Sequence, residues 1–157
     1  MTFERAVDFV LAHEGGYSDD PADTGGATKF GISRKSYPDL DIQGLTKEAA
    51  LVILRRDYWD KCRCGEMPNG LDLLVFEAAV NQGAFAAAKM LQIVLQVPQD
   101  GVIGAITLHA ANNALHIKND YLAQRMYQYA LVPQVLRFGR GWYRRLADCA
   151  EIIFKEN

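Results

Sequence analysis

The feature that most constrains the fold of this chain is a helical period of apolar residues that persists along almost its whole length. At the N-terminus, Phe3, Ala6, Val7 and Val10 fall on one face of a helix, and Leu11 continues the stripe. The period breaks between residues 15 and 41, a window rich in glycine and aspartate. We therefore predict a mainly α-helical fold with one irregular window.

Capping and breaker residues divide the helical pattern into segments. Thr46 is placed to cap a helix that runs to about Asp60. Pro68 opens an alanine-rich apolar helix that stops at Gly83, and we predict that this helix is central and closely packed by its neighbours. We also expect a helix over 85–95, a turn at 100–101, two or three more helices separated near 112–113 and at 133, and strands near 17–19 and 30–33.

Length and composition favour a single domain. A chain of 157 residues with 50% hydrophobic content can bury one substantial core, whereas two independent domains would each be thin. No internal repeat, low-complexity tract or Pro/Ser-rich linker divides the sequence. We expect one domain spanning residues 1–157.

The charge and cysteine patterns exclude several classes of protein. A formal net charge of -2 argues against nucleic-acid binding, which usually requires a basic face. Arginines cluster late in the chain, and such a cluster on a helix is typically a solvated stripe. The three cysteines include a C-x-C pair with no histidine nearby, so we expect reduced structural thiols and no metal site. The arginines are Arg137, Arg140, Arg144 and Arg145, and the cysteines are Cys62, Cys64 and Cys149.

No signal peptide or membrane-spanning run is apparent in the sequence. We therefore expect a chain that is made as a soluble cytoplasmic protein.

Glu14 is the most distinctive residue of the irregular window. If the first helix continues, Glu14 falls on the apolar stripe, three residues beyond Leu11. Burial disfavours the charged form of a carboxyl group and raises its pKa, as a general acid requires. The alternative is that Glu14 is the last exposed residue of a helix that Gly15 and Gly16 end.

Two further polar residues of this window could meet Glu14 if the loop folds back as a hairpin. Asp23 and Thr28 follow it across a polar, Gly- and Pro-containing segment. Gly25 and Gly26 permit positive φ and a close approach of backbone to a ligand, as the floor of a groove needs.

The run from His13 to Ser33, HEGGYSDDPADTGGATKFGIS, resembles the N-terminal signature of glycoside hydrolase family 108, the phage endolysin and secretion-activator muramidases. The resemblance implies that Glu14 is the catalytic acid and that the fold is lysozyme-like, with a small β-hairpin next to the end of the catalytic helix. It extends along nearly the whole chain, although Phe76-Glu77 stands where Phe-Asp is more usual. Its later parts are Tyr58-Trp59, residues 80–83, Leu91-Gln92, residues 100–104 with Thr107, and Gly141-Trp142 with Arg145.

The resemblance also divides the domain into two parts. Residues 1–78 are similar to the catalytic muramidase part, and residues 79–157 form a helical part packed against it. The section from about Ala79 to Ala110 is similar to a small peptidoglycan-binding region. The late arginines could then face acidic groups of the polymer.

Glycosidic cleavage normally uses two carboxyl groups. With Glu14 as the acid, Asp23 is the natural second group, since a polar loop keeps it solvated and ionised. Asp19 and Asp20 are the competing carboxylates, and Asp23 could instead order the loop as a hydrogen-bond acceptor. Thr28 could position the attacking water or could be an ordinary strand threonine.

Substrate contacts are expected from Tyr17, Gly25, Gly26, Tyr58, Trp59 and Asn81. Tyr58 and Trp59 could stack on sugars or could be core anchors. Asn81 could cap the end of its helix or bind a sugar amide. His13 should point away from Glu14, as adjacent helical residues do.

The resulting hypothesis is an N-acetylmuramidase that cleaves the β-1,4 bond between N-acetylmuramic acid and N-acetylglucosamine without a metal or cofactor. Peptidoglycan strands are its expected partner, and release to the wall would need a holin-like pore or a secretion-system partner. The alternatives are a lytic transglycosylase and a non-catalytic wall-binding or secretion-assisting module based on residues 91–107.

Overall fold

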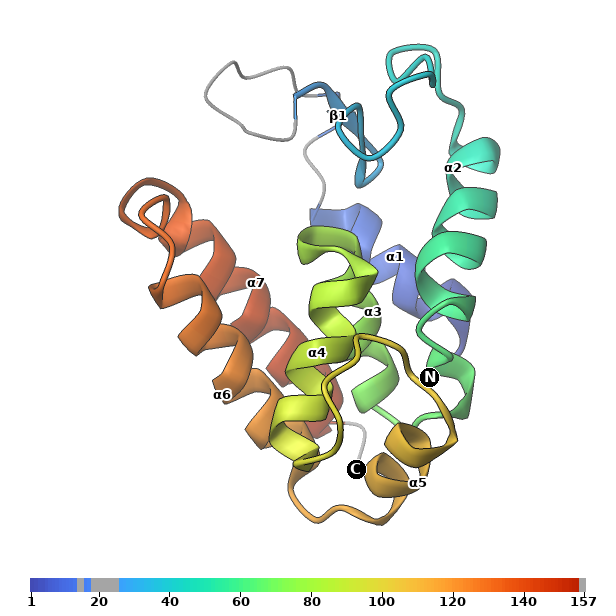
Figure 1. Cartoon of the computed structure of the whole chain (residues 1–157). Coiled ribbons are helices and arrows are strands. Elements are labelled where there is room, and N and C mark those ends of the chain that lie inside the picture. Colours follow the sequence, from blue (N-terminus) through green and yellow to red (C-terminus); the bar gives the residue numbers. More distant parts are fainter. Residues whose placement is uncertain (14–15, 18–25, 156–157) are drawn as a thin grey trace.

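The computed structural model describes residues 1–13, 16–17 and 26–155, and it is mainly helical as the apolar period predicts (Figure 1). The last three helices match the predicted breaks near 112–113 and at 133. The elements are α1 (Phe3–His13), β1 (Thr28–Lys29), β2 (Ile32–Ser33), α2 (Lys47–Leu54), the π-helical turn η1 (Arg55–Asp60), the 3-10 turn η2 (Cys64–Glu66), α3 (Leu71–Gln82), α4 (Ala84–Leu95), α5 (Ala105–Asn113), α6 (Ile117–Ala130) and α7 (Val135–Lys155).

Helix α3 is the centre of the fold, which confirms the prediction. Every residue from Leu71 to Ala79 is buried, and α3 packs against α4, α6, α1 and α7. Small side chains such as Ala78 and Ala79 let the neighbouring helices approach closely on several sides. The helix ends at Gly83, whose positive φ of 88° suits glycine, and α4 begins immediately afterwards.

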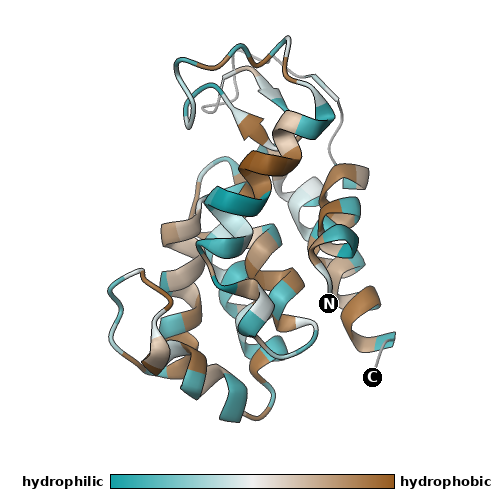
Figure 2. Cartoon of the chain, turned by 90° about the vertical axis from the view of Figure 1, so that its right-hand side faces the viewer, coloured by the Kyte–Doolittle hydropathy of each residue, from teal (hydrophilic) through white to brown (hydrophobic). Residues whose placement is uncertain are grey.

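Helix α2 begins where its capping residue predicts. The Thr46 hydroxyl accepts a hydrogen bond from the Ala49 amide at 3.2 Å. The helix continues without a break into η1, so the pair covers the predicted segment to Asp60. Figure 2 shows hydrophobic and hydrophilic residues sharing the helices, as amphipathic packing requires.

A two-stranded antiparallel hairpin lies beyond the C-terminal end of α1 (Figure 1), and its strands differ from those predicted. β1 pairs with β2, and Phe30 and Gly31 form the connecting turn, with φ of 55° and 78°. Positive φ at both central residues is the type I′ geometry that matches strand twist. The predicted second strand thus contains the turn. Tyr17, predicted to begin the first strand, lies in a bend.

A continuous core links the N-terminal and C-terminal helices. It includes Phe3 of α1, Phe76 of α3, and Leu146 and Ile153 of α7. All three cysteines are buried and free, as expected of structural thiols. Among the described helices, none is long and apolar enough to cross a membrane.

The Thr46 cap provides a test of the α2 assignment. Replacing Thr46 with Ala removes the acceptor of the Ala49 amide and should lower the free energy of unfolding by about 1 kcal/mol in urea denaturation. Thr46→Ser retains the hydroxyl and is the matched control. Equal stability of the Ala variant and the wild type would contradict the cap.

Candidate active site

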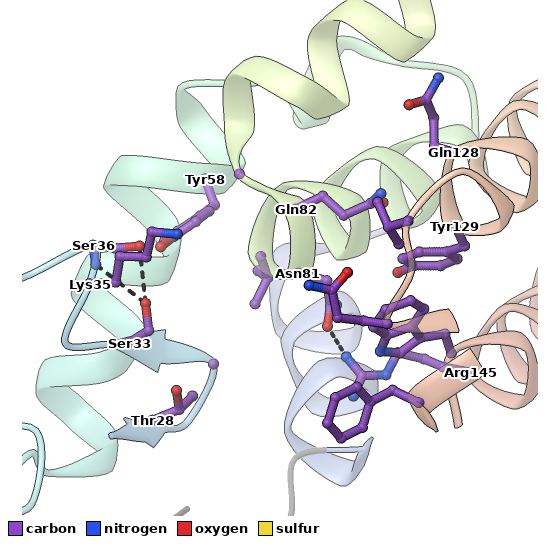
Figure 3. A pocket seen from close by; sticks show the side chains of 17 residues that line it. Thr28, Ser33, Lys35, Ser36, Tyr58, Asn81, Gln82, Gln128, Tyr129 and Arg145 are labelled. Atoms are coloured by element: carbon purple, nitrogen blue, oxygen red, sulfur yellow. Dashed lines mark hydrogen bonds between the residues drawn. The ribbon is translucent and has the colours of Figure 1, made fainter. Parts of the chain in front are cut away.

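A cavity of about 740 Å³ opens between the hairpin side of the molecule and the ends of α3, α6 and α7 (Figure 3). Segments far apart in the sequence therefore line one space. Its described lining residues are Thr28, Gly31, Ser33, Lys35, Ser36, Tyr58, Val80, Asn81, Gln82, Gly83, Gln128, Tyr129, Val132, Gln134, Phe138, Trp142 and Arg145.

The hairpin side of the cavity is rich in hydroxyl groups. The Thr28 hydroxyl donates to the Gly26 carbonyl at 3.1 Å, so Thr28 is anchored to the backbone just before β1. Ser33 donates to the Ser36 hydroxyl at 3.1 Å. Lys35 adds a cationic side chain to the same side. This wall offers hydrogen-bonding groups to a polar ligand.

The opposite wall is aromatic. Tyr129 of α6 stacks on Trp142 of α7 with ring centroids 4.8 Å apart and an interplanar angle of 26°. Phe138 lies one helical turn before Trp142, with centroids 6.1 Å apart. Phe138 and Trp142 are only partly buried, so this wall offers an apolar surface to a ligand.

A buried ion pair lies directly behind the cavity. Glu77 and Arg125 have no exposed side-chain surface, and an Arg125 Nη1 hydrogen donates to Glu77 Oε2. Burial acts to lower the pKa of Arg125, but the charge and hydrogen bond of Glu77 together with the nearby Tyr129 and Tyr121 outweigh burial, so the net shift is upward. Arg125 also donates to Tyr129 at 3.1 Å and to the Gln82 amide oxygen at 3.3 Å. The pair therefore holds two cavity residues in place.

Asn81 connects this pair to the cavity. Its Nδ2 donates to the Glu77 carbonyl at 2.8 Å and to Glu77 Oε1 at 2.6 Å, and its Oδ1 accepts from Arg145. Arg145 Nη1 lies 3.8 Å from Glu77 Oε1 (Figure 3 shows the Asn81 contact). Both hydrogens of the Asn81 amide are thus used within the protein, and its oxygen is the atom that remains able to accept from a ligand.

Tyr58 reaches the cavity from η1, and a second polar cluster supports it. The Tyr37 hydroxyl donates to Asp57 at 2.7 Å, which ties the segment after the hairpin to η1. Hydrogen bonds from Arg56 and then Tyr37 outweigh the effect of burial and hold the pKa of Asp57 below its usual range. Burial raises the pKa of Tyr58, so its hydroxyl stays protonated.

The described residues bring together only some of the predicted site. Thr28, Tyr58 and Asn81 line the cavity, and Gly26 has the positive φ, 67°, expected of a glycine-dependent loop. Tyr17 is exposed and does not line the cavity. Glu14, Asp19, Asp20, Asp23, Gly25 and the remaining predicted loop positions lie outside the described residues.

Trp59 is a correction to the predicted substrate contacts. Its side chain is 5% exposed and packs edge-on against Phe3 and Phe76, with centroids 5.7 and 5.4 Å away. A ring enclosed in this way has no free face for a sugar, so Trp59 is a core anchor.

The aromatic wall was missed by reasoning from the residues. Tyr129 and Phe138 carry no motif, and Trp142 is part of the family resemblance alone. Arg145 was also expected on a solvated stripe, whereas it reaches Asn81 at the cavity. The signal that could have found the wall is the spacing of Phe138, Trp142 and Arg145, which places all three on one face of a helix.

His13 is the last described residue before Glu14, and it is held from two sides. Its Nδ1 lies 2.9 Å from the Phe9 carbonyl oxygen, and its Nε2 lies 2.9 Å from an Asp148 carboxylate oxygen. Neither oxygen can donate, so both contacts are hydrogen bonds together only when both ring nitrogens carry hydrogen. This arrangement links the end of α1 to α7, and His13 does not line the cavity.

The described residues contain no cluster of three or more His, Cys, Asp or Glu side chains that could hold a metal ion.

A helical fold with a hairpin beyond the first helix is the lysozyme-like arrangement, and here it faces a cavity with hydroxyl, amide and aromatic walls. Comparison with family models matches residues 7–83 to glycosyl hydrolase 108. A solved structure of SagA from Brucella abortus superposes with a TM-score of 0.90 at 34% sequence identity, covering 98% of this chain and 94% of that one. The chain belongs to glycosyl hydrolase family 108 and is a glycoside hydrolase by that membership. A search of curated proteins finds no match.

The buried ion pair yields a prediction that separates stability from function. Glu77→Gln leaves the Arg125 charge buried without its counterion and should cost about 3–5 kcal/mol of unfolding free energy. Glu77→Leu combined with Arg125→Met removes both charges and should recover most of that loss. Thermal or urea denaturation measures both effects.

The double variant should nevertheless have reduced hydrolase activity, because Asn81 loses its bond to Glu77 Oε1 and Gln82 loses its bond from Arg125. Full recovery of activity in the double variant would show that the pair does not position the cavity.

Proposed function

We propose that this chain is an N-acetylmuramidase that hydrolyses the β-1,4 bond between N-acetylmuramic acid and N-acetylglucosamine in peptidoglycan. The proposal requires the protein to reach the wall after release, through a holin-like pore or with a secretion-system partner.

The observation that carries the proposal is the pairing of the two cavity walls. Sugars present apolar C–H faces and a rim of hydroxyl and acetamido groups, so a carbohydrate site needs both flat apolar surface and many hydrogen-bonding groups. Trp142 and Phe138 supply the first, and Thr28, Ser33 and Ser36 line the same cavity from its hairpin side. The volume of about 740 Å³ accommodates several sugar-sized units, as a glycan strand requires.

Glu14 is the proposed general acid. It follows His13, the end of α1, and this end lies with the end of α3 below the hairpin (Figure 1). A protonated Glu14 would donate its proton to the glycosidic oxygen as the bond to the anomeric carbon breaks. The sugar left behind develops oxocarbenium character, and a water oxygen then bonds to the same carbon.

Asp23 and Thr28 are the proposed partners of that water. In this role the Asp23 carboxylate stabilises the cation or takes the proton of the water, and the Thr28 hydroxyl orients it. Support comes from Thr28, which lines the cavity and is fixed by its bond to Gly26. Gly25, Gly26, Tyr58 and Asn81 remain the proposed substrate contacts.

Glu14→Gln is the central test, because it removes the proton donor while keeping the side-chain size. We expect the rate of peptidoglycan solubilisation to fall by about 10²- to 10⁴-fold, the usual contribution of general acid catalysis. Binding to insoluble peptidoglycan, measured by co-sedimentation, should be unchanged. Absence of lysis by the wild type would favour a non-catalytic wall-binding module instead.

Mass spectrometry of the digest reports the reaction type. Reducing N-acetylmuramic acid ends are expected from water attack. Products ending in 1,6-anhydromuramic acid would identify a lytic transglycosylase and would overturn the roles given to Asp23 and Thr28.

Trp142 tests the aromatic wall separately from the acid. Trp142→Ala removes the sugar-facing surface and should raise KM about tenfold, which corresponds to ~1.4 kcal/mol of binding energy. Trp142→Phe keeps an aromatic face and should recover most of the affinity. The measurement is initial rate against the concentration of soluble glycan fragments, with circular dichroism to confirm folding. An unchanged KM would contradict the platform role.

A further inference from the structure

The connection between α6 and α7 ends in an exposed apolar tip. Leu136 is 95% exposed, and Leu131 and Tyr127 are each 59% exposed. Figure 1 shows this connection projecting away from the helical body, at the left of the view. Large exposed apolar side chains in and beside a projecting connection indicate a surface that contacts lipid or another protein. We call Tyr127, Leu131 and Leu136 the apolar tip.

The chain around this tip carries positive charge without any negative charge. No aspartate or glutamate stands between Asp120 and Asp148, although the whole chain has a net charge of -2. Leu136, Arg140 and Arg144 follow one another at i, i+4 and i+8, so they form one stripe along α7. Both arginines are exposed. The surface therefore combines the apolar tip with two exposed arginines on the adjoining face of α7.

The spacing of Leu136, Arg140 and Arg144 along α7 matches the distance between the acyl chains and the charged headgroups of a lipid surface. At 1.5 Å per residue, Arg140 lies about 6 Å and Arg144 about 12 Å behind Leu136 along the helix axis. Apolar side chains of peripheral proteins penetrate roughly 5–10 Å into the boundary between headgroups and acyl chains. Leu136 at that depth would leave Arg140 near the headgroup phosphates and Arg144 just outside them.

We propose that the α6–α7 tip docks the protein on a bilayer surface rich in anionic lipids. An anionic polymer alone would pair with the arginines but would leave the leucines in water. A second copy of this chain, joined by two-fold symmetry, would bring the same arginines face to face. An anionic bilayer offers acyl chains to the apolar tip and negatively charged headgroups to Arg140 and Arg144.

Docking in this way leaves the cavity available. Leu131, Leu136, Arg140 and Arg144 are not among its lining residues, whereas the neighbouring Val132 and Phe138 are. The tip would therefore hold the cavity close to the membrane, where it would meet the glycan strands nearest the bilayer. The docking itself does not depend on the proposed hydrolase activity.

Vesicle co-sedimentation of the full chain tests the proposal. Vesicles rich in phosphatidylglycerol should bind the wild type at least about tenfold more strongly than phosphatidylcholine vesicles, and high salt should weaken binding. Leu131→Ser with Leu136→Ser, and separately Arg140→Gln with Arg144→Gln, should each reduce binding about tenfold or more. The matched control is Val102→Ser with Ile106→Ser, a pair exposed by 64% and 66% outside this stripe, which should leave binding unchanged.

The tip variants should retain activity on soluble glycan fragments and should melt at the wild-type temperature, because the altered side chains are exposed. Glu14→Gln should bind vesicles like the wild type, so loss of hydrolysis and loss of docking are distinguished. Equal binding to both kinds of vesicle, or equal loss in the control pair, would overturn the proposal. Binding of the tip to purified peptidoglycan alone, without vesicle binding, would overturn it as well.

Discussion

The Glu77–Arg125 ion pair is the interaction on which the rest of the site depends. Removing two charges from water is costly, and a buried pair is retained only where geometry and further hydrogen bonds offset that cost. Here the additional bonds go to Asn81, Gln82 and Tyr129, which belong to the floor and the aromatic wall of the cavity. The central helix thus fixes both the core and the surface that a ligand would meet.

Local rules predicted most of the helical framework. Helix boundaries depend on interactions within a few residues, so a short stretch of sequence is enough to predict them. Examples are the cap at Thr46, the end of α3 at Gly83 and the break at Pro133. The hairpin strands differ from those predicted because the turn has Phe30 at positive φ, where Asn-Gly is the usual sequence signal. A bulky residue in that conformation is rare, and no propensity argument selects it.

The cavity was harder to predict because its walls come from distant parts of the chain. Thr28 and Asn81 were found through the motif and through a polar break in an apolar helix. The facing wall depends on how α6 and α7 cross α3, which the sequence pattern does not specify. Trp59 illustrates the same limit: its neighbour Tyr58 reaches the cavity, and only the packing of Phe3 and Phe76 assigns Trp59 to the core.

The buried cysteines have a consequence for the release to the wall that the proposed function requires. Thiolate is the form that oxidants attack, and burial raises the pKa of Cys62 to about 12 and those of Cys64 and Cys149 well above the usual value. With little thiolate and little access, the three sulfurs are protected from disulfide exchange and from oxidation to sulfenic acid. The same covalent molecule can therefore exist in a reducing interior and in an oxidising envelope, with no refolding step between them.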